Sequence, residues 1–234
     1  MLGAHHRVIA VDLPGFGHSE PLPPPAAMTT QAASVAELLD QLGVTGATLV
    51  GHSMGGIVIR ALRRDRPDLV ARVVMANAGG IPLTPARLAI IVNGFKVFHF
   101  LFARDAVMRA VTRRPRLRRA AFAGFMGNHD ELRGPFAREV VPVMFAPGFL
   151  GAVVAAGQVA GEPMQPGEMD CPVLLVWGAD DRILPLAEAR TLAASLPDAR
   201  LVVLDGVGHC PMFEAPKAFN DAVLAFTTSE GSPA

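Results

Sequence analysis

The stretch LVGHSMGG, residues 49–56, places Ser53 between Gly51 and Gly55, directly after an apolar run and directly before a segment with helical spacing of apolar residues. A serine hydroxyl is a weak nucleophile, and it becomes reactive when a sharp turn exposes it to a neighbouring base. Glycines at both flanking positions remove side chains that would collide in so tight a turn. The order of strand, turn and helix therefore favours a nucleophilic Ser53 over a serine in an ordinary turn.

Short apolar runs alternate with helical patterns along the chain, and they lie at 7–11, 47–50, 70–75, 173–177 and 200–204. Each run is continuous rather than alternating, as expected for parallel strands that are covered on both faces. Between the first two runs, Thr29 or Thr30 is placed to cap a helix that ends near Gly43. Strand, helix and strand in this order imply a right-handed crossover. We therefore predict an α/β fold with a mostly parallel sheet flanked by helices.

The pattern changes between 81 and 169 to helix-like stretches punctuated by Pro and Gly. We interpret this part as a helical cap inserted into an α/β core that consists of residues 1–80 and 170–234. The cap holds Phe95, Phe98, Phe100 and Phe102, which we expect to divide between a substrate pocket and the core. Seven arginines follow, at 104, 109, 113, 114, 116, 118 and 119. A solvated basic face is our interpretation of them, and a surface that docks on anionic lipid or an acidic substrate is the alternative.

The composition bounds the class of protein. The 234 residues carry 21 basic and 21 acidic side chains and are 51% hydrophobic, which indicates one sizeable folded domain. A net charge of zero gives no general attraction to nucleic acid. Cys171 and Cys210 fit thiols in a reducing compartment, and no metal framework is visible. The N-terminus lacks the pattern of a secretory signal and the apolar stretch 88–103 is too short for a membrane anchor, so we predict a cytoplasmic protein.

Two later runs end in the residues that a nucleophilic serine needs. Asp180 and Asp181 follow the run at 173–177, and His209 follows the run at 200–204. Because parallel strands place their carboxyl ends at one edge of the sheet, we expect an aspartate and His209 to lie near Ser53. Ser19 also follows an apolar run, but no helix follows it, and we interpret it as a loop residue.

On four stretches the chain resembles the α/β-hydrolase superfamily: DLPGFGHSEP at 12–21, LVGHSMGG at 49–56, LLVWGADDRILP at 174–185 and GVGHCPMFEAP at 206–216. The resemblance implies a catalytic triad of Ser53, His209 and Asp181, with the backbone N–H of Met54 as one oxyanion donor. It implies a small-molecule ester or acyl substrate and no cofactor.

In that family the acid lies in a GxxDxxxP pattern, which here selects Asp181 over Asp180. Asp205 is too close to His209 in sequence to orient it, and we expect it to cap a turn. The histidines at 5, 6, 18, 99 and 129 are interpreted as surface or packing residues. His52 is expected to pack at the strand end, at a position that lines the pocket in related enzymes.

Several functions remain open under this resemblance. We favour a serine hydrolase that cleaves an ester or related acyl substrate through an acyl-enzyme. A carbon–carbon bond hydrolase or a cofactor-free haloperoxidase-like enzyme is the alternative with the same triad, although the carbon–carbon hydrolases often have Asn where this chain has His52. A haloalkane dehalogenase or an epoxide hydrolase needs a carboxylate at position 53, so Ser53 disfavours both of these functions. A hydrolase-like protein with impaired catalysis, used for binding, is the alternative of another class.

The chain departs from the family at its N-terminus. Family members carry further strands and a His-Gly loop before the DLPGFG stretch, and nothing comparable precedes Arg7. That loop supplies the second oxyanion donor, and losing such a donor costs about 10²–10³ in kcat. One absent strand lies next to the Ser53 strand in the family, so we expect unpaired backbone there. We expect that Met1 is not the natural start, that a longer form could carry a signal sequence, and that the 234-residue form is aggregation-prone or poorly active.

Overall fold

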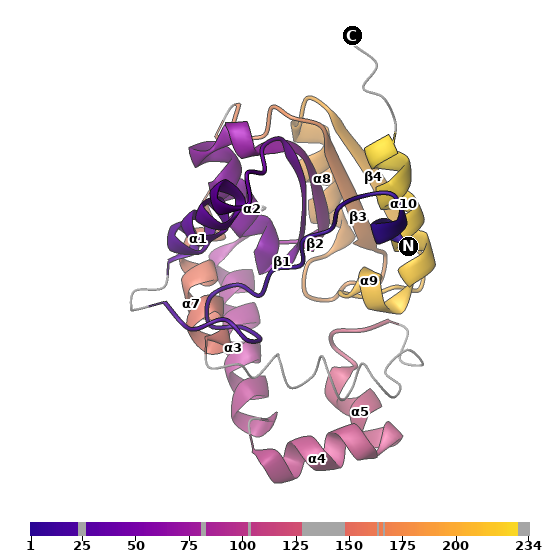
Figure 1. Cartoon of the computed structure of the whole chain (residues 1–234). Helices are drawn as coiled ribbons and strands as arrows, with labels where there is room; N and C mark the ends of the chain where they lie inside the picture. The colour runs from indigo at the N-terminus through magenta and orange to yellow at the C-terminus, as the bar shows by residue number, and fades with distance from the viewer. Residues whose placement is uncertain are drawn as a thin grey trace.

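Four parallel strands form one sheet in the order β1-β2-β3-β4 (Figure 1). The computed structural model describes residues 1–22, 27–80, 83–102, 104–127, 148–162, 164–165 and 167–228. The strands are β1 (Ala47–Ser53), β2 (Val70–Ala78), β3 (Val173–Gly178) and β4 (Ala199–Leu204). Each contains one of the predicted apolar runs, and the predicted parallel α/β sheet is confirmed.

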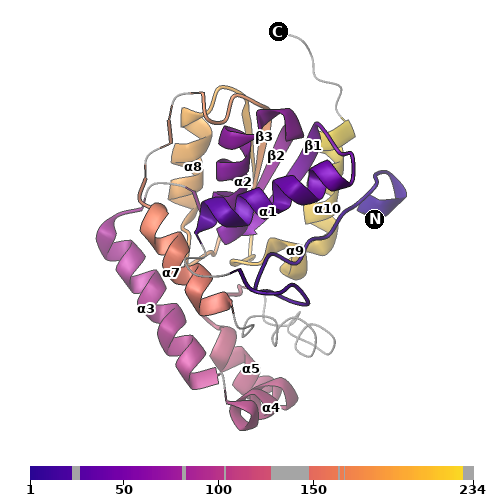
Figure 2. The same cartoon turned by 60° about the vertical axis from the view of Figure 1, so that its left-hand side comes forward.

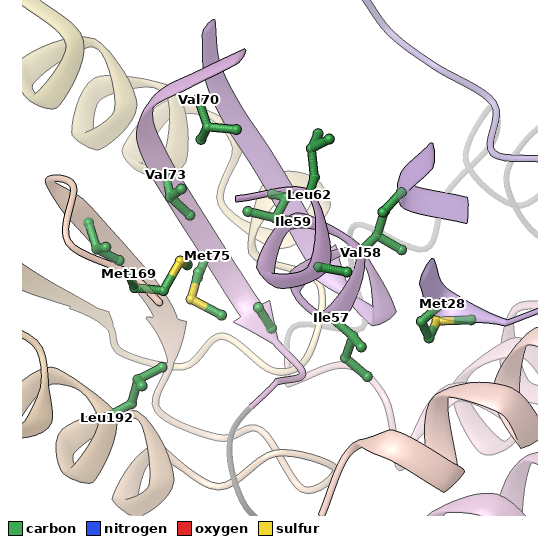
Figure 3. Close-up of a cluster of buried hydrophobic side chains, with 14 of the residues drawn as sticks. Met28, Ile57, Val58, Ile59, Leu62, Val70, Val73, Met75, Met169 and Leu192 are labelled. Carbon is green, nitrogen blue, oxygen red and sulfur yellow. The ribbon is translucent and has the colours of Figure 1, made fainter. Parts of the chain in front are cut away.

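Helices cover both faces of the sheet. The helices α1 (Met28–Gln41), α2 (Met54–Asp65) and α8 (Leu186–Ser195) pack on one face, and α10 (Pro216–Thr228) packs on the other. Successive residues of a strand point to opposite faces, so Val73 and Met75 of β2 join the α2 side while Val74 and Ala76 join the α10 side. Figure 3 shows part of the larger cluster, with side chains from β2 and α2. Three short helical turns, η1 (Leu2–Ala4), η2 (Pro67–Leu69) and α9 (Pro211–Glu214), complete this part of the chain.

The helix α1 starts two or three residues earlier than the prediction of a cap at Thr29 or Thr30 required. Ala27 occupies the N-cap position without a side-chain hydrogen bond. The Thr30 hydroxyl lies inside the helix and donates back to the Ala27 carbonyl at 2.7 Å, so the predicted threonine cap is wrong. Gly43 has a φ of 62°, which fits the predicted end of the helix.

Residues 7–11 do not form a strand, and this prediction is also wrong. Val8 is 56% exposed, and Val50 on the outer edge of β1 is 49% exposed. The segment and β1 line a groove of about 630 Å³. An apolar run forms a strand only when a neighbouring backbone pairs with it, and no such partner lies within the described ranges. The expected unpaired edge of β1 is therefore present in the described part of the sheet, while aggregation stays a prediction.

The described residues between β2 and β3 contain helices and no strand. The helices are α3 (Pro85–Phe102), α4 (Asp105–Arg113), α5 (Pro115–Phe122) and α7 (Phe149–Val159), and we call them the helical insertion. The helices α3 and α7 pack side by side, and α4 and α5 lie at the end of the insertion far from the sheet (Figures 1 and 2). Among the described residues, no helix is long and apolar enough to cross a membrane.

A buried ion pair ties both ends of the helical insertion to α2. Arg60 donates to both carboxylate oxygens of Glu168, at 2.6 and 3.0 Å, just before the chain enters β3. The same guanidinium donates to the carbonyl oxygens of Gly80, which follows β2, and of Glu162, which follows α7. Burial by itself raises the pKa of Glu168, but the hydrogen bonds from Arg60 and from the Gln165 backbone outweigh it and hold this pKa below its usual value.

We expect Arg60→Met to lower the free energy of unfolding by about 3–5 kcal/mol, because it leaves the Glu168 carboxylate buried without its partner. Urea titration at neutral pH measures the change. Arg64→Met is the matched control, because the Arg64–Asp65 pair is about half exposed, and its cost should stay within about 1 kcal/mol. Equal losses in the free energy of unfolding for the two substitutions would show that Arg60 does not hold the helical insertion on α2.

Candidate active site

Ser53 occupies a strained turn between β1 and α2. Its backbone has a φ of 50° and a ψ of −120°, a conformation that residues other than glycine rarely adopt. The backbone N–H of Gly79, which follows β2, donates to the Ser53 carbonyl at 2.6 Å and helps to hold this conformation. The turn therefore has the geometry that the sequence predicted for a nucleophile.

Of the two glycines predicted to avoid a collision around Ser53, only one is required by its surroundings. A Cβ at Gly51 would lie 2.6 Å from Ile59 and 2.8 Å from the Gly55 backbone, which agrees with the prediction. A Cβ at Gly55 would meet nothing within 4 Å, so the predicted collision there is wrong. Gly56 is the second constrained position, because its Cβ would lie 2.5 Å from the carbonyl oxygen of Gly79. The close approach of α2 to the end of β2 explains this difference.

His209 lies next to Asp181 at the carboxyl edge of the sheet. The His209 Nδ1 and the Asp181 Oδ2 are 2.8 Å apart, and both side chains are buried. An ionised carboxylate only accepts hydrogen bonds, so Nδ1 carries the proton and Nε2 keeps its lone pair. The His209 imidazole is thus held in the tautomer that can accept a proton at Nε2. The exposed Asp180 donates its backbone N–H to the Val207 carbonyl and does not contact His209.

Four hydrogen bonds surround the Asp181 carboxylate. Besides His209, the Asn77 amide donates to Oδ2 at 2.6 Å, and the backbone N–H groups of Ile183 and Leu184 donate to Oδ1. Burial by itself raises the pKa of Asp181, but the interactions with His209 and the other donors outweigh it and hold this pKa below its usual value. Asn77 has a φ of 41° and was not predicted as a site residue. Its place at the end of β2, the strand beside that of Ser53, was the only signal for it in the sequence.

Ser53 and His209 line the same pocket, which has a volume of about 370 Å³. Within the described ranges no hydrogen bond joins the Ser53 hydroxyl to the His209 ring. Such contacts are often long in unliganded enzymes and tighten when substrate binds. Met54 is the first residue of α2, where backbone N–H groups have no partner inside the helix. Its N–H therefore has no partner within the helix, and its role as an oxyanion donor stays a prediction.

The walls of this pocket are apolar. Phe16, Phe95, Phe125 and Phe149 line it, and so do aliphatic residues of α3 and α7; no Lys, Arg, Asp or Glu is among the described lining residues. Phe98 is buried among neighbouring aromatic rings. Phe100 is 67% exposed, so Phe100 belongs to neither the pocket nor the core. The side chain of Phe102 lies outside the described residues, as does His129. Phe16 belongs to the same loop as Ser19, and its role in the pocket was not predicted.

His52 and Cys210 flank the candidate triad without being able to replace its members. The Nε2 of His52 donates to the His209 carbonyl oxygen at 2.7 Å. Burial, and then repulsion from a charged His209, lower the pKa of His52 to about 3, so this ring stays neutral at ordinary pH. Burial, and then the nearby Glu214 and Asp181 carboxylates, raise the pKa of the Cys210 thiol to about 12. Cys210 and Cys171 are both free thiols.

Glu214 holds the loop that carries His209. Its carboxylate accepts the backbone N–H groups of Gly208 at 2.9 Å and of Cys210 at 3.0 Å, the residues on either side of His209. It also accepts the N–H of Gly127, beyond α5 of the helical insertion. The His209 backbone N–H donates to the Phe125 carbonyl at 2.7 Å. One buried carboxylate thus fixes the His209 loop to the helical insertion.

We expect Glu214→Gln to lower kcat by about 10- to 100-fold with little change in KM, because the amide NH₂ faces a backbone donor and moves the His209 loop. Steady-state kinetics on a p-nitrophenyl ester measures both constants. Glu37→Gln, on the exposed face of α1, is the matched control and should keep the wild-type kcat. An unchanged kcat in the Glu214 variant would show that the loop does not depend on this carboxylate.

A family model described as the alpha/beta hydrolase fold matches residues 2–216, and the chain belongs to this family. The chain is 27% identical over 226 residues to a 2-hydroxy-6-oxononadienedioate/2-hydroxy-6-oxononatrienedioate hydrolase from Pseudomonas sp, covering 95% of this chain and 77% of that protein. It is 28% identical over 235 residues to a 2-hydroxy-6-oxo-6-phenylhexa-2,4-dienoate hydrolase from Burkholderia cepacia, covering 96% of this chain and 78% of that protein.

Solved structures show the same fold. A hydrolase from Pseudomonas aeruginosa PA01 superposes with a TM-score of 0.74 at 25% identity, over 97% of this chain and 82% of that one. A thermophilic esterase from Thermogutta terrifontis superposes with a TM-score of 0.70 at 23% identity, over 92% and 77%. The chain is therefore a hydrolase-family protein of the α/β type.

Proposed function

We propose that this protein is a serine hydrolase that cleaves an ester or related acyl substrate through an acyl-enzyme. The observation that carries the proposal is that Ser53 and His209 line one apolar pocket while Asp181 lies 2.8 Å behind His209. Ser53 is the proposed nucleophile, His209 the general base and acid, and Asp181 the residue that orients His209. No step of this reaction needs a cofactor.

The reaction proceeds in two halves. The Ser53 Oγ attacks the substrate carbonyl while His209 Nε2 takes the hydroxyl proton, and the Met54 N–H donates to the oxygen that becomes negative. The tetrahedral intermediate collapses, the bond to the leaving group breaks, and His209 gives its proton to that group. A water molecule then attacks the acyl-enzyme with His209 as base, which releases the acid and restores Ser53.

The described pocket walls favour an uncharged, apolar acyl group. A carboxylate on the substrate would lose its hydration in this pocket without a described Lys or Arg to pair with it. Six phenylalanine rings instead provide apolar surface, and a volume of about 370 Å³ suits a short or medium chain or one aromatic ring.

A carbon–carbon bond hydrolase is the second candidate, because both curated relatives described above are named for 2-hydroxy-6-oxo dienoate substrates. The same three residues serve this chemistry when the bond that breaks joins the carbonyl carbon to another carbon. The leaving carbon then takes a proton in place of an alcohol oxygen, and water releases the acid as before. The absence of a cation from the described pocket lining argues against a dicarboxylate substrate.

Parallel assays separate these candidates. The protein is given a series of p-nitrophenyl esters from acetate to octanoate and, separately, 2-hydroxy-6-oxo-6-phenylhexa-2,4-dienoate. We expect kcat/KM to be at least 10-fold higher for the best ester, with an optimum at an acyl chain longer than acetate. A preference for the dienoate would establish the carbon–carbon hydrolase instead. A folded protein without turnover of either class would favour a non-catalytic binding protein.

A further inference from the structure

Charge is divided unevenly between the helical insertion and the remainder of the chain. The whole sequence holds 21 basic and 21 acidic residues, but the segment from Pro85 to Phe122 holds nine Lys or Arg residues and one acidic residue, Asp105. The remaining sequence therefore holds 12 basic and 20 acidic residues. This neutral protein thus has a strongly basic end.

The outer face of α3 exposes large apolar side chains. Ile90 is 68% exposed, Val97 58%, Phe100 67% and Leu101 50%. The spacing of seven between Ile90 and Val97, and of three and four from Val97 onward, places these residues along one side of the helix. We call these four residues the α3 ridge. None of the four lines the pocket that contains Ser53.

Basic side chains lie at the C-terminal end of the α3 ridge and on the two helices that follow it. The Arg104 guanidinium lies 5.3 Å from the centre of the Phe100 ring. Arg113, Arg114 and Arg116 are exposed where α4 meets α5, at the end of the insertion that the C-terminus of α3 approaches (Figure 2). Among the described residues, none of these three arginines forms an ion pair. Their charges therefore remain available to an anionic partner.

We propose that the α3 ridge and the arginines of α4 and α5 dock the protein on an anionic lipid bilayer. Exposed aliphatic and aromatic side chains enter the boundary between lipid headgroups and acyl chains, and basic side chains beside them attract anionic headgroups. An acidic protein would pair with the arginines but would leave the four exposed apolar side chains of the ridge in contact with water. An anionic bilayer provides apolar acyl chains for the ridge and negative headgroups for the arginines.

Docking in this orientation places α3 between the bilayer and the pocket. The inner face of α3 contributes Leu88, Ile91, Val92 and Phe95 to the pocket that contains Ser53. The ridge faces outward on the same helix. A lipophilic substrate dissolved in the bilayer would therefore be one helix away from the pocket.

Vesicle sedimentation tests the proposal without requiring activity, and Ser53→Ala protein can be used for it. We expect binding to vesicles of phosphatidylcholine with 30% phosphatidylglycerol to exceed binding to pure phosphatidylcholine by at least fivefold. Charge reversal of Arg113, Arg114 and Arg116 to Glu should lower this binding at least fivefold. Reversal of the exposed Arg7, Arg190 and Arg200, which lie outside the insertion, changes the net charge equally and should lower it less than twofold.

The apolar contribution is tested separately. Val97→Ser together with Phe100→Ser should lower binding at least fivefold while leaving turnover of a soluble short-chain ester unchanged, since neither residue lines the pocket. In the Phe100→Trp variant, vesicles should shift the emission of the introduced tryptophan to shorter wavelength, and brominated lipids should quench it. The native Trp177 is fully buried and serves as the internal reference.

Three results would overturn the proposal. The first is a less than fivefold preference for anionic over neutral vesicles. The second is an equal loss of vesicle binding in the charge reversal of the insertion and in the control reversal. The third is a tryptophan emission of the Phe100→Trp variant that does not shift when vesicles are bound. Light scattering adds a fourth, because a dimer that dissociates in the ridge variant would identify the ridge as a contact between two copies of this chain. A wild-type protein that binds anionic vesicles but does not turn over esters would contradict the proposed function. The proposed docking surface would not be affected by that result.

Discussion

We expect Ser53→Ala to abolish ester turnover, with a loss in kcat of about 10⁶-fold, the magnitude seen when the nucleophile of a serine triad is removed. The alanine methyl group cannot attack a carbonyl, and His209 has no proton to take. The Cβ already present in serine is retained, so the strained φ of 50° costs alanine no more than it costs serine, and the melting temperature should change by only a few degrees. Steady-state kinetics and thermal unfolding on the same preparation measure both quantities.

Ser19→Ala is the matched control for this variant. Ser19 also follows an apolar run and a glycine, but its hydroxyl donates to the Asp12 carbonyl in a surface loop. The control should retain wild-type turnover. A Ser53 variant that keeps more than about one hundredth of the wild-type kcat would exclude Ser53 as the nucleophile.

Asp181→Asn has the second-largest expected effect, a loss of about 10⁴-fold in kcat. The Asp181 carboxylate keeps the His209 proton on Nδ1, and its Oδ2 lies 2.8 Å from that atom. An asparagine amide can turn its NH₂ toward His209, which favours the tautomer with the proton on Nε2. That nitrogen could then no longer accept the Ser53 proton.

Asp180→Asn separates the two adjacent aspartates. Asp180 is exposed and does not contact His209, so its variant should retain wild-type kcat. The reverse pattern, an inactive Asp180 variant beside an active Asp181 variant, would assign the orienting acid to Asp180. The kinetics of both variants should be compared at one pH, so that the protonation of His209 is not a second variable.

The sheet and the turn at Ser53 could be predicted because their signals are local. Continuous apolar runs mark four strands that lie in the order of the sequence, and the glycines around Ser53 mark the turn. The prediction failed at residues 7–11, because strand formation depends on a backbone partner that the sequence of the run does not reveal. It also failed at Gly55, where the structure places the constraint on Gly56 instead.

The candidate triad could be predicted in part because Asp181 and His209 each follow a strand and match a family pattern. Asn77 and Glu214 were not predicted, since their roles depend on which backbone and side-chain atoms the fold brings to them. Arg60 and Glu168 are similar, because 108 positions separate them and only the folded chain shows that they form an ion pair. Positioning residues are determined by tertiary contacts rather than by spacing along the chain.

Labelling with a fluorophosphonate probe tests the central claim most directly. Such a probe reacts covalently with a serine that a neighbouring base activates, whatever the natural substrate is. We predict that the folded wild-type protein takes up one probe molecule, that fragmentation mass spectrometry assigns it to Ser53, and that neither Ser53→Ala nor heat-denatured protein is labelled. A wild-type protein that shows a cooperative melting transition but no labelling, or a Ser53→Ala variant labelled as strongly as wild type, would contradict this account.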